Sequence, residues 1–228
     1  MKYSVQHLLL ALGALVLIPT AGAAGDPEAG ADKVSMCAAC HGSDGNSPAP
    51  SFPKIADLGE PYLLKQLRDI QAWDQAEGDA KASTGRAVPQ MTGMLRNLSD
   101  QDLQDIAAYY DEQTLQLTGA SELQVQVNSG EKVDALALGE KIYRAGDIET
   151  GVPACAACHG PAGGGNEPAG YPRLGGQYPE YIASQLRAFR AGDRTNDGEQ
   201  MTMRLSAKHL SDAEIEAVAN YIGGLTDN

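Results

Sequence analysis

The chain has 228 residues and a formal net charge of −13, with 30 acidic residues against 17 Lys and Arg. This acidity excludes a nucleic-acid-binding protein, which needs a basic surface for the phosphates, and it argues against adhesion to anionic lipid. Acidic proteins are steered towards basic patches on other proteins. Only 5 % of the residues are aromatic, so two domains of about 100 residues each would have thin hydrophobic cores.

The first 23 residues are predicted to be a secretory signal peptide. Lys2 precedes an apolar run over 8–18, Pro19 ends that run, and Ala21-Gly22-Ala23 is a small-residue pattern that signal peptidase accepts. The run is shorter than the ~20 residues that a spanning helix needs, so an uncleaved anchor is the alternative. We expect a periplasmic protein, and peripheral attachment to the membrane stays open.

A first helical unit is predicted over residues 24–113. A helix around 27–36 leads into Cys37-Ala38-Ala39-Cys40-His41, and a second helix covers 61–72. A last helix starts at Ser99, which with the acidic residue three positions later forms a weak capping box before apolar residues at helical spacing. No segment alternates long enough to predict a strand.

The segment 114–131 is predicted to be a linker, because it contains the turn-rich sequences Thr118-Gly119-Ala120-Ser121 and Asn128-Ser129-Gly130. A second unit, 132–228, follows it. Its predicted helices lie at 132–144, at 179–190 and behind a capping box formed by Ser211 and Glu214.

The second unit repeats the motifs of the first in the same order, which is typical of a duplicated domain. The fold class is therefore all-α, with two tandem domains related by internal duplication. The repeated sequences are Cys37–Gly42 and Cys155–Gly160, Tyr62–Arg68 and Tyr181–Arg187, Met91–Met94 and Met201–Met203, and Leu98–Asp100 and Leu210–Asp212.

Both cysteine motifs have the form C-x-x-C-H, the attachment site of c-type haem. Two thiols on one helical turn reach both vinyl groups of a porphyrin, and the histidine that follows lies beneath the iron. Two covalently bound haem c groups would also supply the apolar bulk that the thin cores lack. The predicted thioether residues are Cys37, Cys40, Cys155 and Cys158, and the predicted axial histidines are His41 and His159.

Three other roles of the cysteines are possible. A thioredoxin-like redox pair needs a βαβ setting, which this sequence lacks. Disulfides are common in exported proteins, and four cysteines can share a zinc ion. The duplicated C-x-x-C-H context favours haem over all three.

The second axial ligand of each iron is predicted to be a methionine. Met91 and Met94 in the first unit, and Met201 and Met203 in the second, occupy equivalent loops rich in Gly, Thr and Arg. Methionine–histidine ligation raises the reduction potential of a haem. His209 directly precedes a helix cap and is expected on the surface. The residues alone leave the choice within each pair open.

Both units resemble class I cytochrome c domains, and residues 24–228 as a whole resemble the dihaem cytochrome c4 family. The motifs that carry this resemblance are Asp44–Pro50, Tyr62–Leu67, Met91–Met94 and Arg194–Gly198. One departure is the longer approach to the second cysteine motif, over 144–154, whose role stays open.

The resemblance implies further roles for residues of this chain. It implies Met91 and Met203 as the iron ligands, and the carbonyls of Pro53 and Pro172 as acceptors of the Nδ1–H groups of the haem histidines. It also implies that Gly30 and Gly139 let the first and last helices of each domain approach closely, near Tyr109 and Tyr221. The two domains are expected to face each other about an approximate two-fold axis, with the haem propionates near the interface.

An iron with both axial positions filled by protein has no open site for substrate, which indicates electron transfer and not an enzyme. By resemblance, we expect a dihaem carrier that takes electrons from a quinol-oxidising complex to a terminal oxidase or reductase. One alternative is the haem subunit of a flavoprotein or dehydrogenase complex. Another is a dihaem peroxidase-like enzyme, in which one iron lacks a sixth ligand.

Overall fold

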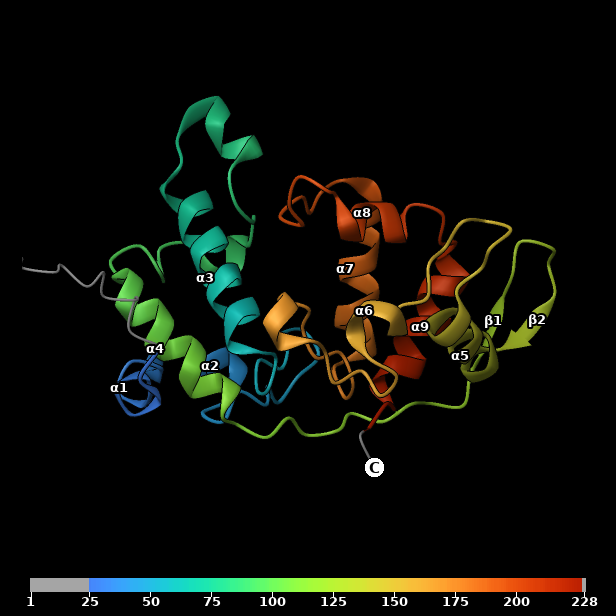
Figure 1. Cartoon of the computed structure of the whole chain (residues 1–228), viewed down its shortest axis with the longest axis horizontal. Helices are drawn as coiled ribbons and strands as arrows, with labels where there is room; N and C mark the ends of the chain where they lie inside the picture. The colour runs from blue at the N-terminus through green and yellow to red at the C-terminus, as the bar shows by residue number, and fades with distance from the viewer. Residues whose placement is uncertain (1–24, 227–228) are drawn as a thin grey trace, which may run out of the picture.

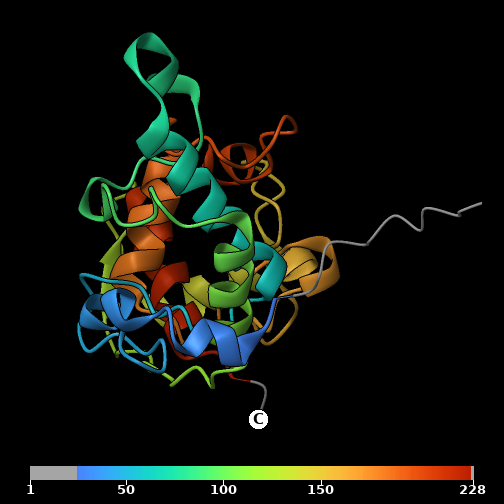
Figure 2. The same ribbon diagram turned by 90° about the vertical axis from the view of Figure 1, so that its left-hand side faces the viewer.

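The computed structural model describes residues 25–226, so the predicted signal peptide lies outside the described residues. Two helical lobes lie side by side and are joined by an extended segment (Figure 1). In the end-on view of Figure 2 the first lobe lies in front of the second, so the lobes follow each other along the long axis. The helices of the first lobe are α1 (Pro27–Ala31), α2 (Ser35–His41), α3 (Glu60–Gln75), η1 (Gly78–Ser83), η2 (Pro89–Met91) and α4 (Asp100–Asp111).

The second lobe repeats this plan with small differences. The helices predicted at 61–72 and 179–190 are confirmed, and so are the two capped helices at the ends of the units. Among residues 25–226, no helix is long and apolar enough to cross a bilayer. The helices of the second lobe are α5 (Ala135–Ala145), α6 (Ala156–His159), η3 (Glu167–Ala169), α7 (Pro179–Ala191), α8 (Thr202–Ala207) and α9 (Asp212–Gly223).

The helix predicted around 27–36 is two helices, with a break before Ser35. At the break Lys33 forms an ion pair with Asp105 of α4. This contact joins residues far apart in the sequence, so local periodicity could not predict it.

Both predicted capping boxes are present. Ser99 accepts the backbone N–H of Asp102 at 3.2 Å, and the Asp102 carboxylate accepts the N–H of Ser99 at 2.8 Å. Ser211 and Glu214 make the same reciprocal pair at 3.3 and 2.7 Å. Each box satisfies donors that the start of a helix leaves free.

The first and last helices of each lobe cross at a glycine, as the resemblance implied. A Cβ on Gly30 would lie 2.1 Å from the carbonyl oxygen of Asp105 and 2.7 Å from the Cβ of Tyr109. A Cβ on Gly139 would lie 2.2 Å from the carbonyl oxygen of Ala217 and 2.8 Å from the Cβ of Tyr221. Only glycine fits at either crossing.

A small antiparallel ribbon differs from the expectation that the chain has no strands. Strand β1 (Gln124–Gln126) pairs with β2 (Lys132–Asp134), and Val125 is buried against Ala135 and Ala217. Three-residue strands are too short to show an alternating pattern. Since β2 occupies 132–134, α5 starts three residues later than predicted.

The extended segment before the ribbon is bound to the second lobe. The N–H groups of Thr118 and Gly119 donate to the carbonyls of Gly176 and Gly223, at 3.1 and 2.9 Å. The Asn220 side chain accepts the N–H of Ser121 at 2.9 Å. The chain between the lobes is therefore held in place by hydrogen bonds to the backbone and to one side chain of the second lobe.

Candidate functional site

The first cysteine motif lies on the short helix α2. Cys37 is buried in the core of the first lobe, and Cys40 and His41 follow within the last turn. In the second lobe Cys155 precedes α6, which carries Cys158 and His159. The four thiols are free of disulfides. Within residues 25–226, no group of three His, Cys, Asp or Glu side chains could hold a metal ion such as zinc.

Both motif histidines have the same hydrogen bond. The Nδ1 of His41 lies 2.9 Å from the carbonyl oxygen of Pro53, and the Nδ1 of His159 lies 2.9 Å from that of Pro172. A carbonyl can only accept, so Nδ1 carries the proton and the Nε2 lone pair is free for a metal. Burial lowers the pKa of both imidazoles and outweighs the hydrogen bonds to the proline carbonyls, which raise it. The lowered pKa favours the neutral form of each imidazole.

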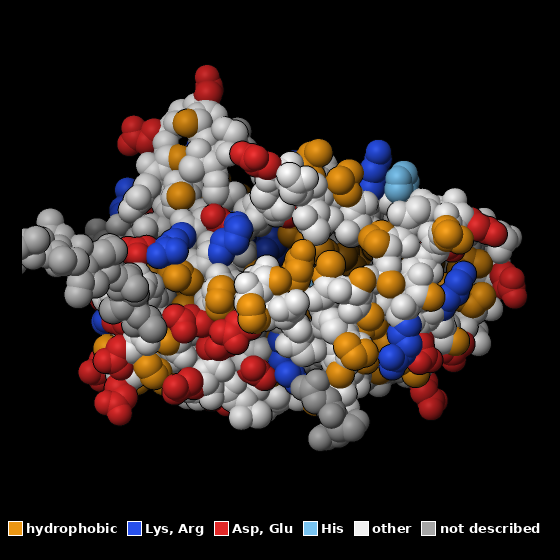
Figure 3. All heavy atoms as spheres, in the orientation of Figure 1, with side chains coloured by type: hydrophobic (Ala, Val, Ile, Leu, Met, Phe, Trp, Pro, Cys, Tyr) orange, Lys and Arg blue, Asp and Glu red, His pale blue; other side chains and the backbone are white. Residues whose placement is uncertain are grey.

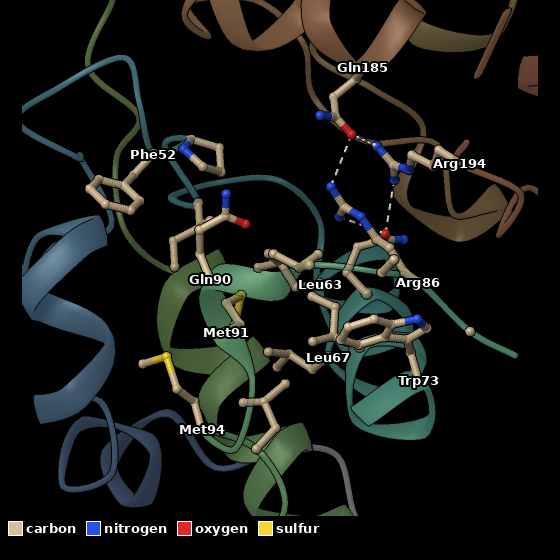
Figure 4. Close-up of a pocket in the computed structure, with 18 of the residues that line it drawn as sticks. Phe52, Leu63, Leu67, Trp73, Arg86, Gln90, Met91, Met94, Gln185 and Arg194 are labelled. Atoms are coloured by element: carbon tan, nitrogen blue, oxygen red, sulfur yellow. Dashed lines mark hydrogen bonds between the residues drawn. The ribbon is translucent and has the colours of Figure 1, made fainter. Parts of the chain in front are cut away.

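A cavity of about 640 Å³ opens beside α2 and α3 in the first lobe. Figure 4 shows Leu63, Leu67 and Trp73 of α3 around it, with Met91 at the end of η2 and Met94 from the turn that follows. Cys37, Cys40 and His41 also line the cavity. The lining thus combines two thiols, an imidazole, two thioethers and an apolar wall. This donor set, in a cavity of ligand size, fits a covalently bound haem.

The two methionines of the second lobe lie in different environments. Met201 precedes α8 with φ +50° and is 41 % exposed. Met203 lies in the first turn of α8 and packs against the same hydrophobic core as Cys155. His209 is exposed, as predicted.

Two arginines, one from each lobe, meet at the cavity where the second lobe closes it (Figure 4). Each guanidinium donates to a glutamine of its own lobe and to a tyrosine and a glutamine of the other. The bonds are those of Arg86 to Gln66 (3.0 Å), Tyr181 (3.1 Å) and Gln185 (3.1 Å), and those of Arg194 to Gln185 (2.7 Å), Tyr62 (3.3 Å) and Gln66 (2.9 Å).

These acceptors are all neutral oxygens, so the hydrogen bonds themselves do not neutralise the two guanidinium groups, and the Asp69 carboxylate interacts electrostatically with Arg86. An anionic group in the cavity would be stabilised there, and a haem carries two propionate carboxylates that guanidinium binds well. Arg86 belongs to no motif found in the sequence. The repeated Tyr-x-x-x-Gln spacing in α3 and α7 is the signal that could have revealed this network.

A second polar contact joins the lobes through Gln177 and Lys54. Gln177 is 2 % exposed, accepts the N–H of Lys54 at 3.0 Å and donates to the Lys54 carbonyl at 2.7 Å. Nearby, the Tyr178 hydroxyl donates to the Ser47 carbonyl at 2.6 Å. The interface is therefore specified by directional hydrogen bonds.

Comparison with known proteins decides the family. The cytochrome c family model matches residues 28–112 and again 136–226. A cytochrome c4 of Stutzerimonas stutzeri is 52 % identical over 99 % of this chain and 100 % of its own length. The chain belongs to the cytochrome c4 family.

The fold agrees with this membership. The crystal structure of reduced recombinant cytochrome c4 from Pseudomonas stutzeri superposes with a TM-score of 0.80 at 51 % identity, covering 89 % of this chain and 100 % of that one. A more distant relative, the thiosulfate dehydrogenase electron acceptor of Stutzerimonas stutzeri strain A1501, is 33 % identical over 97 % of this chain and 96 % of its own length. As a member of the cytochrome c4 family, this chain is an electron carrier with two cytochrome c domains and two covalently bound haem c groups.

Proposed function

We propose that this cytochrome is a periplasmic carrier that takes electrons from a quinol-oxidising complex to a terminal oxidase or reductase, and that it has no catalytic site of its own. The observation that carries the proposal is the combination of side chains around the first cavity. His41 offers a free Nε2, and Met91 and Met94 line the same space. A histidine and a methionine are the protein donors that the iron of a c-type haem would take from this chain.

We assign the individual residues as follows. Cys37, Cys40 and His41, with Met91, hold the first haem, and Cys155, Cys158 and His159, with Met203, hold the second. The packing of Met203 against the core and the exposure of Met201 support the choice within the second pair. Pro53 and Pro172 fix the rings of the two histidines through their carbonyls.

The bound haem supplies a one-electron iron couple, and the chain's own residues set its surroundings. The hydrogen bonds at Nδ1 leave the Nε2 lone pairs of His41 and His159 available to a metal. Arg86 and Arg194 would pair with the propionate carboxylates of a bound haem at the contact between the lobes. Because this contact uses residues of both lobes, it holds the two sites near each other and supports electron transfer between them.

Export and domain division belong to the same proposal. Residues 1–23 direct secretion, 24–113 and 132–228 form the two cytochrome domains, and 114–131 link them. Haem c attachment outside the bacterial cytoplasm is consistent with this leader.

One relative supports a second candidate for the electron donor. Since a protein described as a thiosulfate dehydrogenase electron acceptor resembles nearly the whole chain, a periplasmic dehydrogenase is an alternative electron donor. This corresponds to the dehydrogenase-complex alternative raised by the sequence.

The first test concerns the ligands. The oxidised holoprotein should be low-spin at both irons, with a near-infrared sulfur-to-iron band at the strength of two methionines. Met91→Leu and Met203→Leu should each remove half of the band, whereas Met94→Leu and Met201→Leu should leave it whole. A high-spin component in the wild-type protein would favour the peroxidase-like alternative.

The second test concerns the donor. The oxidised protein is mixed either with membranes that contain a quinol-oxidising complex and quinol, or with a thiosulfate dehydrogenase and thiosulfate. Faster haem reduction by the membranes supports the respiratory proposal. Faster reduction by the dehydrogenase would replace it with the second candidate.

A further inference from the structure

A buried aspartate ties down the methionine loop of the first lobe. The side chain of Asp74, in the last turn of α3, is only 2 % exposed. Its Oδ2 accepts the backbone N–H of Gly93 at 3.0 Å and the Nε of Arg96 at 3.3 Å. Gly93 lies between Met91 and Met94, so this carboxylate holds the backbone that carries both thioethers.

Asp197 makes the corresponding contact in the second lobe. Its side chain is also 2 % exposed, and its two oxygens accept the backbone N–H and the Nε of Arg204, each at 2.8 Å. Arg204 directly follows Met203 in the first turn of α8. Met201, at the start of that helix, provides no capping side chain, so Asp197 satisfies the free donor instead.

The two aspartates do not correspond in the internal repeat. The alignment that pairs Tyr62 with Tyr181 pairs Asp74 with Asp193, which is exposed. Both lobes nevertheless place a buried carboxylate on a backbone N–H next to a methionine and on the guanidinium of a loop arginine. The same arrangement therefore occurs at two positions that the duplication does not relate. This indicates that the methionine loop of each lobe has to be held in one conformation.

We propose that Asp74 and Asp197 are positioning residues that keep the methionine sulfur of their own lobe at the iron. The inference rests on the proposed ligands Met91 and Met203. A loop held by a buried carboxylate has only a small population of the open conformation, in which the methionine has left the iron. A competing ligand can bind the iron only in that open conformation. Loss of the carboxylate should therefore raise the affinity for an external ligand at one haem and not at the other.

The test is a titration of the oxidised holoprotein with imidazole, followed by loss of the sulfur-to-iron band. In Asp74→Asn, half of the band should be lost at a roughly 10-fold lower imidazole concentration, because apparent affinity scales with the open fraction. Asp197→Asn should do the same to the other half, and the double variant to the whole band. Asp32→Asn changes an exposed carboxylate that does not line the cavity, so it is the control and should titrate like the wild type.

The leucine variants of Met91 and Met203 separate the two possible failures. If each removes half of the band but both asparagine variants titrate like the wild type, the positioning role is wrong and the proposed ligands stand. If the leucine variants leave the band whole, the proposed ligands themselves are wrong, and the positioning role fails with them.

A second pair of variants keeps the test informative if the asparagine variants lose haem. Arg96 and Arg204 have side chains 55 % and 27 % exposed, so their replacement is tolerable for folding. Arg96→Gln and Arg204→Gln remove one bond to each carboxylate and should shift the titration in the same direction. Unchanged imidazole affinity in both would overturn the proposal.

Discussion

Asp105 shows how a single buried carboxylate can join two helices. Its side chain is 4 % exposed in α4, and its Oδ1 accepts the N–H of Asp26 at 2.9 Å, just before α1. The same oxygen accepts the amide of Gln101 at 2.8 Å, and Oδ2 pairs with Lys33. Burial raises the pKa of this carboxyl, but these bonds and the Lys33 ammonium outweigh burial, so the pKa lies below its usual value.

A lowered pKa makes the contribution of Asp105 to stability depend on pH. The stabilisation is present above the ordinary carboxyl pKa and is lost as the pH falls through the lowered pKa of the folded state. Asp105→Asn should lower the free energy of unfolding at neutral pH by about 1.5–3 kcal/mol, the usual value of hydrogen bonds to a charged group. The difference from the wild type should shrink on acidification below a pH of about 4.

Thermal unfolding of both proteins across a pH series measures this effect. Asp32→Asn changes an exposed carboxylate nearby and serves as the control. A constant difference between Asp105→Asn and the wild type at all pH values would contradict the charged role of Asp105.

At the scale of elements, the crossing of α5 and α9 depends on the absence of one side chain. A Cβ on Gly139 would lie 2.2 Å from the carbonyl oxygen of Ala217, and that oxygen is backbone, which cannot rotate away. The helices would have to separate, and this would open the core that contains Ile142 of α5 and Val218 of α9.

Gly139→Ala should therefore destabilise the second lobe by about 1–3 kcal/mol, the usual cost of overpacking a core. Gly139→Ser should cost more, because its side chain is larger. Denaturant unfolding monitored by circular dichroism gives both values. Equal stability of the wild type and Gly139→Ala would show that the crossing can shift without cost.

At the scale of the whole molecule, the lobes are coupled by two sets of polar contacts, one around Arg86 and Arg194 and one between Gln177 and Lys54. On the face shown in Figure 3, acidic side chains gather along the lower part of the first lobe, and others lie at the tip of that lobe and at the far end of the second lobe. Gln177 makes two hydrogen bonds to the backbone of Lys54 and is almost fully buried. Its loss would leave two buried backbone groups without partners.

We expect Gln177→Leu to weaken the coupling of the lobes by a few kcal/mol, since each unsatisfied buried group costs about 1–3 kcal/mol. In calorimetry, the unfolding transition should broaden or split, as the two cores lose their mutual support. Tyr178→Phe removes a single bond to Ser47 and should have a smaller effect. An unchanged transition in Gln177→Leu would mean that the lobes already unfold independently.

Much of this protein could be predicted from short segments of sequence. The C-x-x-C-H motifs by themselves predict covalent haem attachment, because this attachment needs two thiols on one helical turn and a neighbouring imidazole. The capped helices at Ser99 and Ser211 are determined by residues within four positions of each other. Duplication was evident because both copies keep their motifs in one order.

Tertiary structure decided what depends on distant residues. It separated the exposed Met201 from the packed Met203, although the two are nearly adjacent in sequence. It also broke the first helix where Lys33 turns to Asp105, and it placed Asp74 and Asp197, which do not correspond in the repeat, in matching contacts. Local patterns carry propensity and spacing, whereas burial and hydrogen-bond partners arise only when segments far apart in the chain come together.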